Sequence, residues 1–211
     1  MHLDHLSFAA GHEGLRGTAE RLGELLGAEF TDGGFHPRFG TRNQILPLSN
    51  GHYLEVVEVL DHPAADKAPF GQAVRSRTEA GGGWLGWVVS VDDLAPIEER
   101  IGRTAVDGSR HQPDGNLLEW RQIGVKGMQG DPQLPFFVSW ITPPELHPSV
   151  GGGAVELLSI EIAGNKQRLD QWLGGQSDQV LPDVEIEWTA PNGQPGLEAV
   201  LFSTPQGKVR I

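Results

Sequence analysis

The order of predicted strands and helices repeats along this chain, and an internal repeat constrains a fold more than any single motif does. Residues 2–10 are rich in apolar residues and are predicted to form a strand, and residues 14–27 to form an amphipathic helix. A glycine-containing turn at residues 32–34 then leads into short strands around residues 40–48 and 53–60. The first unit is predicted to have the order β-α-β-β-β, in which residues 40–48 and 53–60 locate two of the three strands after the helix.

The same order recurs in the second part of the chain. An apolar strand is predicted at residues 84–91, followed by a helix over residues 94–101, where apolar residues recur at helical spacing. Strands are then predicted near residues 106–110, 116–123 and 134–141. Two units of the same order indicate a duplicated supersecondary module.

A third copy follows a run of glycines. A strand is predicted at residues 157–162 and a helix around residues 169–173, followed by strands at residues 184–188 and 197–203. The dipeptide Asn192-Gly193 is predicted to turn the chain between the last two strands. The third unit therefore has a similar order.

These repeats predict an α+β fold. We expect one domain over residues 1–145, made of two modules (residues 1–61 and 83–143) that a linker (residues 62–82) joins. Residues 154–211 are expected to form a C-terminal unit packed on that domain.

Composition and charge exclude several classes of function. The 211 residues include no cysteine, which excludes disulfides, thiolate nucleophiles and cysteine-ligated metal centres. The formal net charge is −12 and no run of lysine and arginine occurs, so we expect no nucleic-acid partner. No apolar stretch of membrane-spanning length and no leader segment is evident, so we expect a cytoplasmic protein without a membrane partner.

A histidine and a carboxylate lie in two predicted strands of the first unit. Side chains of a strand alternate between its faces. Strict alternation predicts two faces with these members: Leu3, His5, Ser7 and Ala9 in one strand, and Tyr53, Glu55, Val57 and Val59 in the other. His5 and Glu55 can then be half of a metal site, an acid–base pair, or an ion pair of the interior.

Other polar side chains are candidates for binding a substrate. Arg42 and Asn43 follow a Gly-Thr turn and are expected to bind a carboxylate or carbonyl group, or else to be surface residues of a strand. Arg110, Trp120 and Gln122 lie in strands of the second unit and are expected to form the far wall of a pocket.

Four short segments, in this order and spacing, resemble the vicinal oxygen chelate superfamily, and within it the glyoxalase-like branch. The segments are Leu3-Asp4-His5-Leu6, Gly40-Thr41-Arg42-Asn43, Tyr53-Leu54-Glu55 and Pro135-Phe136-Phe137-Val138-Ser139-Trp140. The resemblance covers residues 1–145 directly and the third unit more loosely. It implies that the βαβββ modules pair into a cupped mixed sheet around a metal ion, with helices on the outer face.

The resemblance also implies where metal ligands belong, on the first and last strand of each module. His5 and Glu55 match these positions in the first module, whereas Gly86 and Ser139 fall there in the second. Glycine has no side chain, and we expect Ser139 to bind substrate. A divalent ion (Zn, Ni, Mn or Fe) held by His5 and Glu55 stays an open alternative, but the missing ligands favour an absent or weakly bound metal.

Three functions follow from the resemblance and from these residues. The first is a metal-dependent lyase, isomerase or dioxygenase acting on a small oxygenated metabolite. The second is a metal-free ligand-binding or drug-sequestering module, and the third is a metal-free enzyme with His5 and Glu55 as acid and base. All three have a small-molecule partner, and sheet edges of this fold are compatible with a homodimer. We expect an enzyme rather than a binding module.

Overall fold

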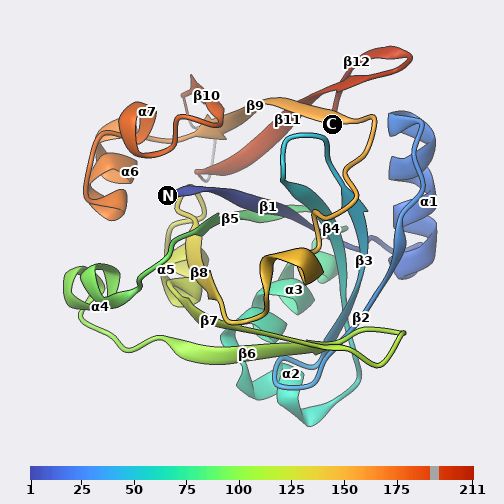
Figure 1. The fold of residues 1–211 in the computed structure, drawn as a ribbon, viewed down its shortest axis with the longest axis horizontal. Coiled ribbons are helices and arrows are strands. Elements are labelled where there is room, and N and C mark those ends of the chain that lie inside the picture. Colours follow the sequence, from blue (N-terminus) through green and yellow to red (C-terminus); the bar gives the residue numbers. More distant parts are fainter. Residues whose placement is uncertain (191–194) are drawn as a thin grey trace.

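The chain folds into a closed eight-stranded barrel and a separate four-stranded sheet, as Figure 1 shows. This computed structural model describes residues 1–190 and 195–211. The barrel strands follow the order β1-β4-β3-β2-β6-β7-β8-β5, and those of the second sheet follow β10-β9-β11-β12. The predicted α+β class of repeated βαβββ modules is confirmed, and the expected cupped sheet closes on itself.

Each of the first two units supplies half of the barrel. The first consists of β1 (His2–Ala9), α1 (Gly14–Leu26), β2 (Thr31–His36), β3 (Thr41–Pro47) and β4 (Tyr53–Val59). The second consists of β5 (Gly83–Ser90), α4 (Ala95–Ile101), β6 (Val106–His111), β7 (Leu117–Ile123), α5 (Val125–Gly130) and β8 (Phe136–Trp140). The halves join where β1 pairs with β5 and where β2 pairs with β6.

Two further segments complete the fold. The linker holds α2 (Pro63–Lys67) and α3 (Pro69–Glu79), and a short 3-10 helix, η1 (Pro144–Leu146), follows β8. The third unit consists of β9 (Glu156–Ala163), α6 (Lys166–Leu173), α7 (Ser177–Val180), β10 (Glu185–Thr189), β11 (Gly196–Thr204) and β12 (Gly207–Arg210). Its predicted Asn192-Gly193 turn lies outside the described residues. Every predicted strand is found, whereas β2, which covers the turn predicted at residues 32–34, is a strand that the sequence analysis misses. The elements β12, α2, α5, α7 and η1 are not predicted by the sequence either.

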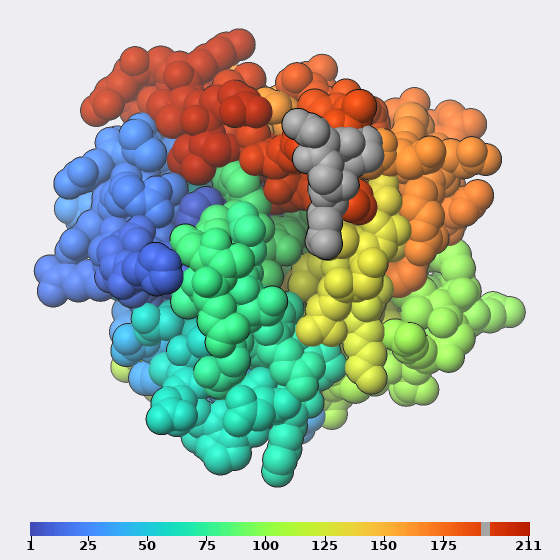
Figure 2. Space-filling model, turned by 180° about the vertical axis from the view of Figure 1, so that it is seen from behind, coloured from blue at the N-terminus to red at the C-terminus, as the bar shows by residue number. Residues whose placement is uncertain are grey.

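The third unit packs against the outside of the barrel. Seen from behind in Figure 2, it covers the top of the molecule, opposite the segment that holds α2 and α3. One hydrophobic cluster contains Leu6 and Trp87 of the barrel together with Ile160 and Phe202 of the third unit. Burial of such side chains stabilises the fold by about 1.5–3 kcal/mol each. The third unit therefore shares a core with the barrel.

A β-bulge in β1 changes which side chains enter the barrel. Leu3 pairs with Val89 and His5 with Val88, so β1 advances two residues where β5 advances one. Leu3 consequently packs in the outer hydrophobic cluster, and the prediction that it shares a face with His5 is wrong. A bulge lets neighbouring residues break strand alternation, and here it brings the side chains of Asp4 and His5 into contact.

In the described part of the chain, no helix has the length and apolar character that crossing a membrane requires.

The seam between β2 and β6 depends on a glycine, and we predict that Gly34→Ala opens it. Gly34 has φ +97°, and an added Cβ would lie 1.8 Å from the backbone oxygen of His111. Gly51 is a matched control with φ +80° and, among the described residues, nothing within 4 Å of its Cβ position. We expect Gly51→Ala to cost about 1–2 kcal/mol from backbone strain, and Gly34→Ala to cost about 1–3 kcal/mol more from the clash.

Urea unfolding of both variants measures this difference. Equal losses of unfolding free energy would show that the approach of β2 to β6 tolerates a side chain.

Candidate functional site

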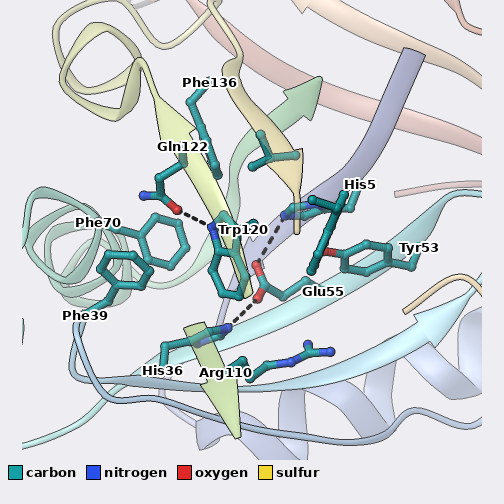
Figure 3. Close-up of a pocket in the computed structure, with 12 residues that line it drawn as sticks. His5, His36, Phe39, Tyr53, Glu55, Phe70, Arg110, Trp120, Gln122 and Phe136 are labelled. Carbon is teal, nitrogen blue, oxygen red and sulfur yellow. Dashed lines mark hydrogen bonds and ion pairs between the residues drawn. The ribbon is translucent and has the colours of Figure 1, made fainter. Parts of the chain in front are cut away.

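A small pocket lies inside the barrel, between the strands of both modules (Figure 3). Its polar lining residues are His5, His36, Glu55, Arg110 and Gln122. Its aromatic lining residues are Phe39, Tyr53, Phe70, Trp120, Phe136 and Trp140. The space open to water-sized molecules is about 30 Å³, which is room for roughly two water molecules. The pocket therefore suits a small ligand, or a larger one only if the aromatic rings move.

Glu55 is the central charge of this pocket. It lies in β4, and its carboxylate accepts hydrogen bonds from Ser7 Oγ at 2.8 Å and Asn43 Nδ2 at 2.7 Å. The Nε2 atoms of His5 and His36 each lie 3.9 Å from one of its oxygens, as the dashed lines of Figure 3 show. Burial raises the pKa of Glu55, but the two histidines and two hydrogen bonds outweigh it and leave that pKa below its ordinary value. Glu55 is therefore ionised at neutral pH.

Asp4 lies behind His5 and orients it. Its carboxylate lies 2.6 Å from His5 Nδ1, accepts from Trp140 Nε1 at 2.9 Å, and lies 3.3 Å from His147 Nε2. Burial raises the pKa of Asp4, but the hydrogen bonds from His147 and His5 hold it well below its usual range. An ionised carboxylate only accepts, so His5 Nδ1 carries the proton. The opposite nitrogen, Nε2, then faces Glu55 and the pocket with a free lone pair when the ring is neutral.

The aromatic surroundings hold the His5 ring in this orientation. Its ring stacks on that of Tyr53, with the centroids 4.4 Å apart and the planes at 17°. The Phe136 ring lies nearly perpendicular to that of His5, at 82°, with the centroids 6.3 Å apart. Tyr53 lies directly opposite His5 because β1 and β4 pair in parallel. A histidine packed in this way is positioned before any ligand arrives.

His36, in β2, is a second buried imidazole beside Glu55. Its Nδ1 lies 3.0 Å from Thr41 Oγ1. Burial lowers the pKa of His36 to about 4, although the charge of Glu55 partly opposes this shift. His36 is therefore neutral at pH 7 and does not neutralise Glu55.

The structure brings together most of the residues that the sequence predicts for the site. His5, Glu55, Arg110, Trp120 and Gln122 line the pocket. Trp120 Nε1 donates to Gln122 Oε1 at 2.7 Å, which orients the indole, and an added Cβ at Gly108 on the facing strand would overlap that ring.

Asn43 is fully buried in β3. Its amide holds Glu55. Its predicted contact with a substrate stays a prediction, because Asn43 Oδ1 has no hydrogen-bond partner among the described residues.

Arg42 and Ser139 lie away from the pocket, which corrects their predicted placement. The Arg42 side chain is 45% exposed and forms an ion pair of 2.6 Å with Glu58. Ser139 Oγ donates to the backbone oxygen of Asp92 at 3.3 Å. Both residues alternate with inward neighbours, Asn43 and Trp140, so their own side chains point outward. The sequence shows which residues share a strand face, but not which face is inside.

Three residues of the site are missed by the sequence reasoning. Asp4 is missed because strict alternation places it opposite His5, and only the bulge reverses this. His36 falls between the predicted turn and the next predicted strand. His147 follows η1 in a loop, and its contact with Asp4 spans 143 residues of sequence. No local pattern signals such a contact.

The donors of the pocket do not fit a divalent metal ion. Within residues 1–190 and 195–211, no group of three or more His, Cys, Asp or Glu side chains is arranged to hold one. At Gly86, the first-strand position of the second module, an added Cβ would lie 2.7 Å from Met128 Sδ. The thioether of α5 therefore occupies the place of a ligand. Whether His5 and Glu55 bind a metal in solution stays a prediction for measurement.

A barrel of two paired βαβββ modules is the vicinal oxygen chelate fold. The chain belongs to the glyoxalase-like domain family, whose model matches residues 3–176. A hypothetical protein from Staphylococcus aureus shares the fold with 14% identity and a TM-score of 0.61, covering 99% of this chain and 84% of that chain. Methylmalonyl-CoA epimerase from Mycobacterium tuberculosis matches with 17% identity and a TM-score of 0.44, covering 69% of this chain and 90% of that chain. Comparison with curated proteins finds no match.

The buried neutral state of His36 predicts a dependence of stability on pH. Its pKa is about 4 in the folded chain and about 6.5 in an unfolded one, so the unfolded state binds more protons between these values. The contribution is complete above pH 6.5 and is lost as the pH falls to 4, by up to about 3 kcal/mol. Glu55 and Asp4 add losses only below about pH 4.5, because their pKa values are lowered.

We therefore expect the unfolding free energy of His36→Gln to vary less than that of the natural chain between pH 6.5 and 4.5. Urea unfolding across this range measures the slope. His12→Gln, at an exposed position, is the control and should keep the natural slope. Parallel curves for all three proteins would mean that His36 has the same pKa in the folded chain as in the unfolded one.

Proposed function

We propose that this protein is an enzyme that transfers a proton on a small oxygenated metabolite, with His5 as the general base and without a metal ion. The observation that carries the proposal is the line Asp4–His5–Glu55 in the pocket of the barrel. Asp4 fixes the proton on Nδ1, and Nε2 lies 3.9 Å from Glu55 Oε2 on the side of the cavity. A base in this tautomer, held by a buried carboxylate, accepts a proton at the outer nitrogen.

The two carboxylates have different roles in this mechanism. When His5 Nε2 removes a proton from a carbon next to a carbonyl group, the ring becomes an imidazolium. Asp4 at 2.6 Å and Glu55 at 3.9 Å stabilise that cation from both sides. Glu55 is ionised already, so it acts as a fixed charge and the protonated His5 returns the proton. The proposal thus refines the predicted acid–base pair: His5 moves the proton, and Glu55 stabilises the protonated form of His5.

The pocket also limits the size of the substrate. About 30 Å³ is open to water-sized molecules, so compounds of a few heavy atoms are the first candidates. Aromatic rings around the cavity exclude bulk water, which strengthens the electrostatic effect of the carboxylates on His5.

Exchange of carbon-bound hydrogen in deuterium oxide tests the proposal whatever product the reaction forms. Proton NMR follows the loss of signal next to the carbonyl group in small compounds such as hydroxyacetone, pyruvate and 2-oxobutyrate. We expect His5→Gln to slow exchange by at least about 100-fold, the usual contribution of a general base. We expect Asp4→Asn to slow it as well, by no more than the loss of His5 itself does, because the amide favours the wrong tautomer of His5.

His12→Gln carries the same substitution at an exposed histidine and should exchange at the natural rate. Circular dichroism shows whether each variant is folded. Equal exchange in His5→Gln and the natural protein would eliminate His5 as the base.

Removal of metal ions tests the other half of the proposal. We expect protein dialysed against EDTA to contain no Zn, Ni, Mn or Fe by elemental analysis and to exchange at an unchanged rate. The reason is that the acid–base groups are all side chains of the protein. Loss of exchange in EDTA with recovery on adding one of these ions would overturn the metal-free mechanism.

A second candidate is a binding module that holds a ligand without turnover. Six aromatic rings line the pocket, and such walls suit an apolar ligand. Ligands that raise the melting temperature of both the natural protein and His5→Gln, with no exchange in any compound, would support this alternative.

A further inference from the structure

Arg110 is a buried cation that the proposed proton transfer does not use. It lies in β6, is 2% exposed, and lines the pocket on the side of Glu55 and Tyr53, as Figure 3 shows. Its Nε and Nη2 atoms are buried and have no hydrogen-bond partner in the described part of the chain. A buried donor left without a partner costs about 1–3 kcal/mol, and more when it is charged.

Glu55 does not supply the missing acceptor, although it is near. Its two oxygens already accept from Ser7 and Asn43. Asp4 is occupied by donors from β1, β8 and the loop at His147. Among the described residues no hydrogen bond joins Arg110 Nε or Nη2 to either carboxylate, so the guanidinium keeps two N–H directions for a ligand.

The surroundings of the pocket also suit an anion. A second hollow on the surface contains the exposed cations Arg103 and Lys126, and it shares Phe39, Phe70 and Gln122 with the pocket. The Phe39 and Phe70 rings lie edge to face, 5.8 Å apart, where the two spaces meet. In a chain of net charge −12, two exposed cations in this neighbouring hollow attract anions locally.

We propose that Arg110 binds the carboxylate of the substrate, so that the substrate class is small organic carboxylates with an apolar body. A guanidinium offers parallel N–H donors that match the two oxygens of a carboxylate. The aromatic lining of the pocket holds the apolar part, and the bound carboxylate places the neighbouring carbon in the cavity that His5 faces. The assignment of a reaction rests on the proposed function, whereas binding of the carboxylate does not.

Paired ligands of equal shape test the inference on EDTA-treated protein. 2-Methylpropanoate and 2-methylpropanamide differ in charge but hardly in size, both have only a few heavy atoms, and calorimetry measures the affinity of each. We expect the acid to bind at least tenfold more tightly than the amide. We expect Arg110→Met to abolish this difference and Arg110→Lys to restore part of it, because lysine keeps the charge but not the fork.

Arg38→Met is the matched control, since Arg38 is an exposed arginine that pairs with Asp107, and it should keep the natural preference. Inorganic phosphate is included as a competing anion. Equal binding of acid and amide by the natural protein, or tight binding of phosphate without binding of carboxylates, would overturn the proposal.

Stability separates a binding role of Arg110 from a structural one. Removing an unpaired buried charge relieves a desolvation penalty, so we expect Arg110→Met without ligand to melt at or above the temperature of the natural protein. A large fall in melting temperature would mean that Arg110 holds the barrel together and would contradict the inference.

The two proposals fail in distinguishable ways. If carboxylates bind only when Arg110 is present but no compound exchanges hydrogen, the binding site is supported and the enzyme proposal is rejected. If exchange needs His5 but is equally fast for neutral compounds and in the Arg110→Met variant, the enzyme proposal is supported and the carboxylate site is rejected.

Discussion

Two buried carboxylates, Asp4 and Glu55, organise the interior of the barrel, because neither can stay ionised there without donors from several strands. Asp4 is held by His5, Trp140 and His147, and Glu55 by Ser7 and Asn43. Burying an unpaired carboxylate is strongly unfavourable. These donors come from both modules and from the loop before the third unit. The site therefore exists only after the barrel has closed around it.

The same interior combines satisfied and unsatisfied polar groups. The carboxylates have their donors, whereas Arg110 retains buried N–H groups without partners among the described residues. Natural proteins keep few such groups, and those they keep commonly belong to sites of function. The glyoxalase-like positions His5 and Glu55 remain, but Met128 fills the space at Gly86. This arrangement is the basis of the proposed proton transfer by side chains.

The sequence predicts local structure well because local structure depends on neighbouring residues. Helix α1 follows from apolar residues at helical spacing, and Gly27 ends it with φ +65°. Strand alternation also places Trp120 and Gln122 on one face, which proves to be the inner one. It misplaces Leu3 because a bulge is not visible in the alternation itself. The sequence analysis also predicts wrongly that Arg42 and Ser139 line the pocket, since periodicity does not say which face of a strand is buried.

The sequence by itself determined the repeated order of strands and helices, the family and two central residues, His5 and Glu55. Hydrophobic periodicity and turn residues act over a few positions, so they can be recognised directly in the sequence. The tertiary structure alone decided that Asp4 and His147 meet across 143 residues and that His36 lies beside Glu55. It also decided that Arg110 is buried with two donors that have no partner among the described residues. Burial and electrostatics depend on segments that only folding brings together, and they decide the chemistry of the pocket.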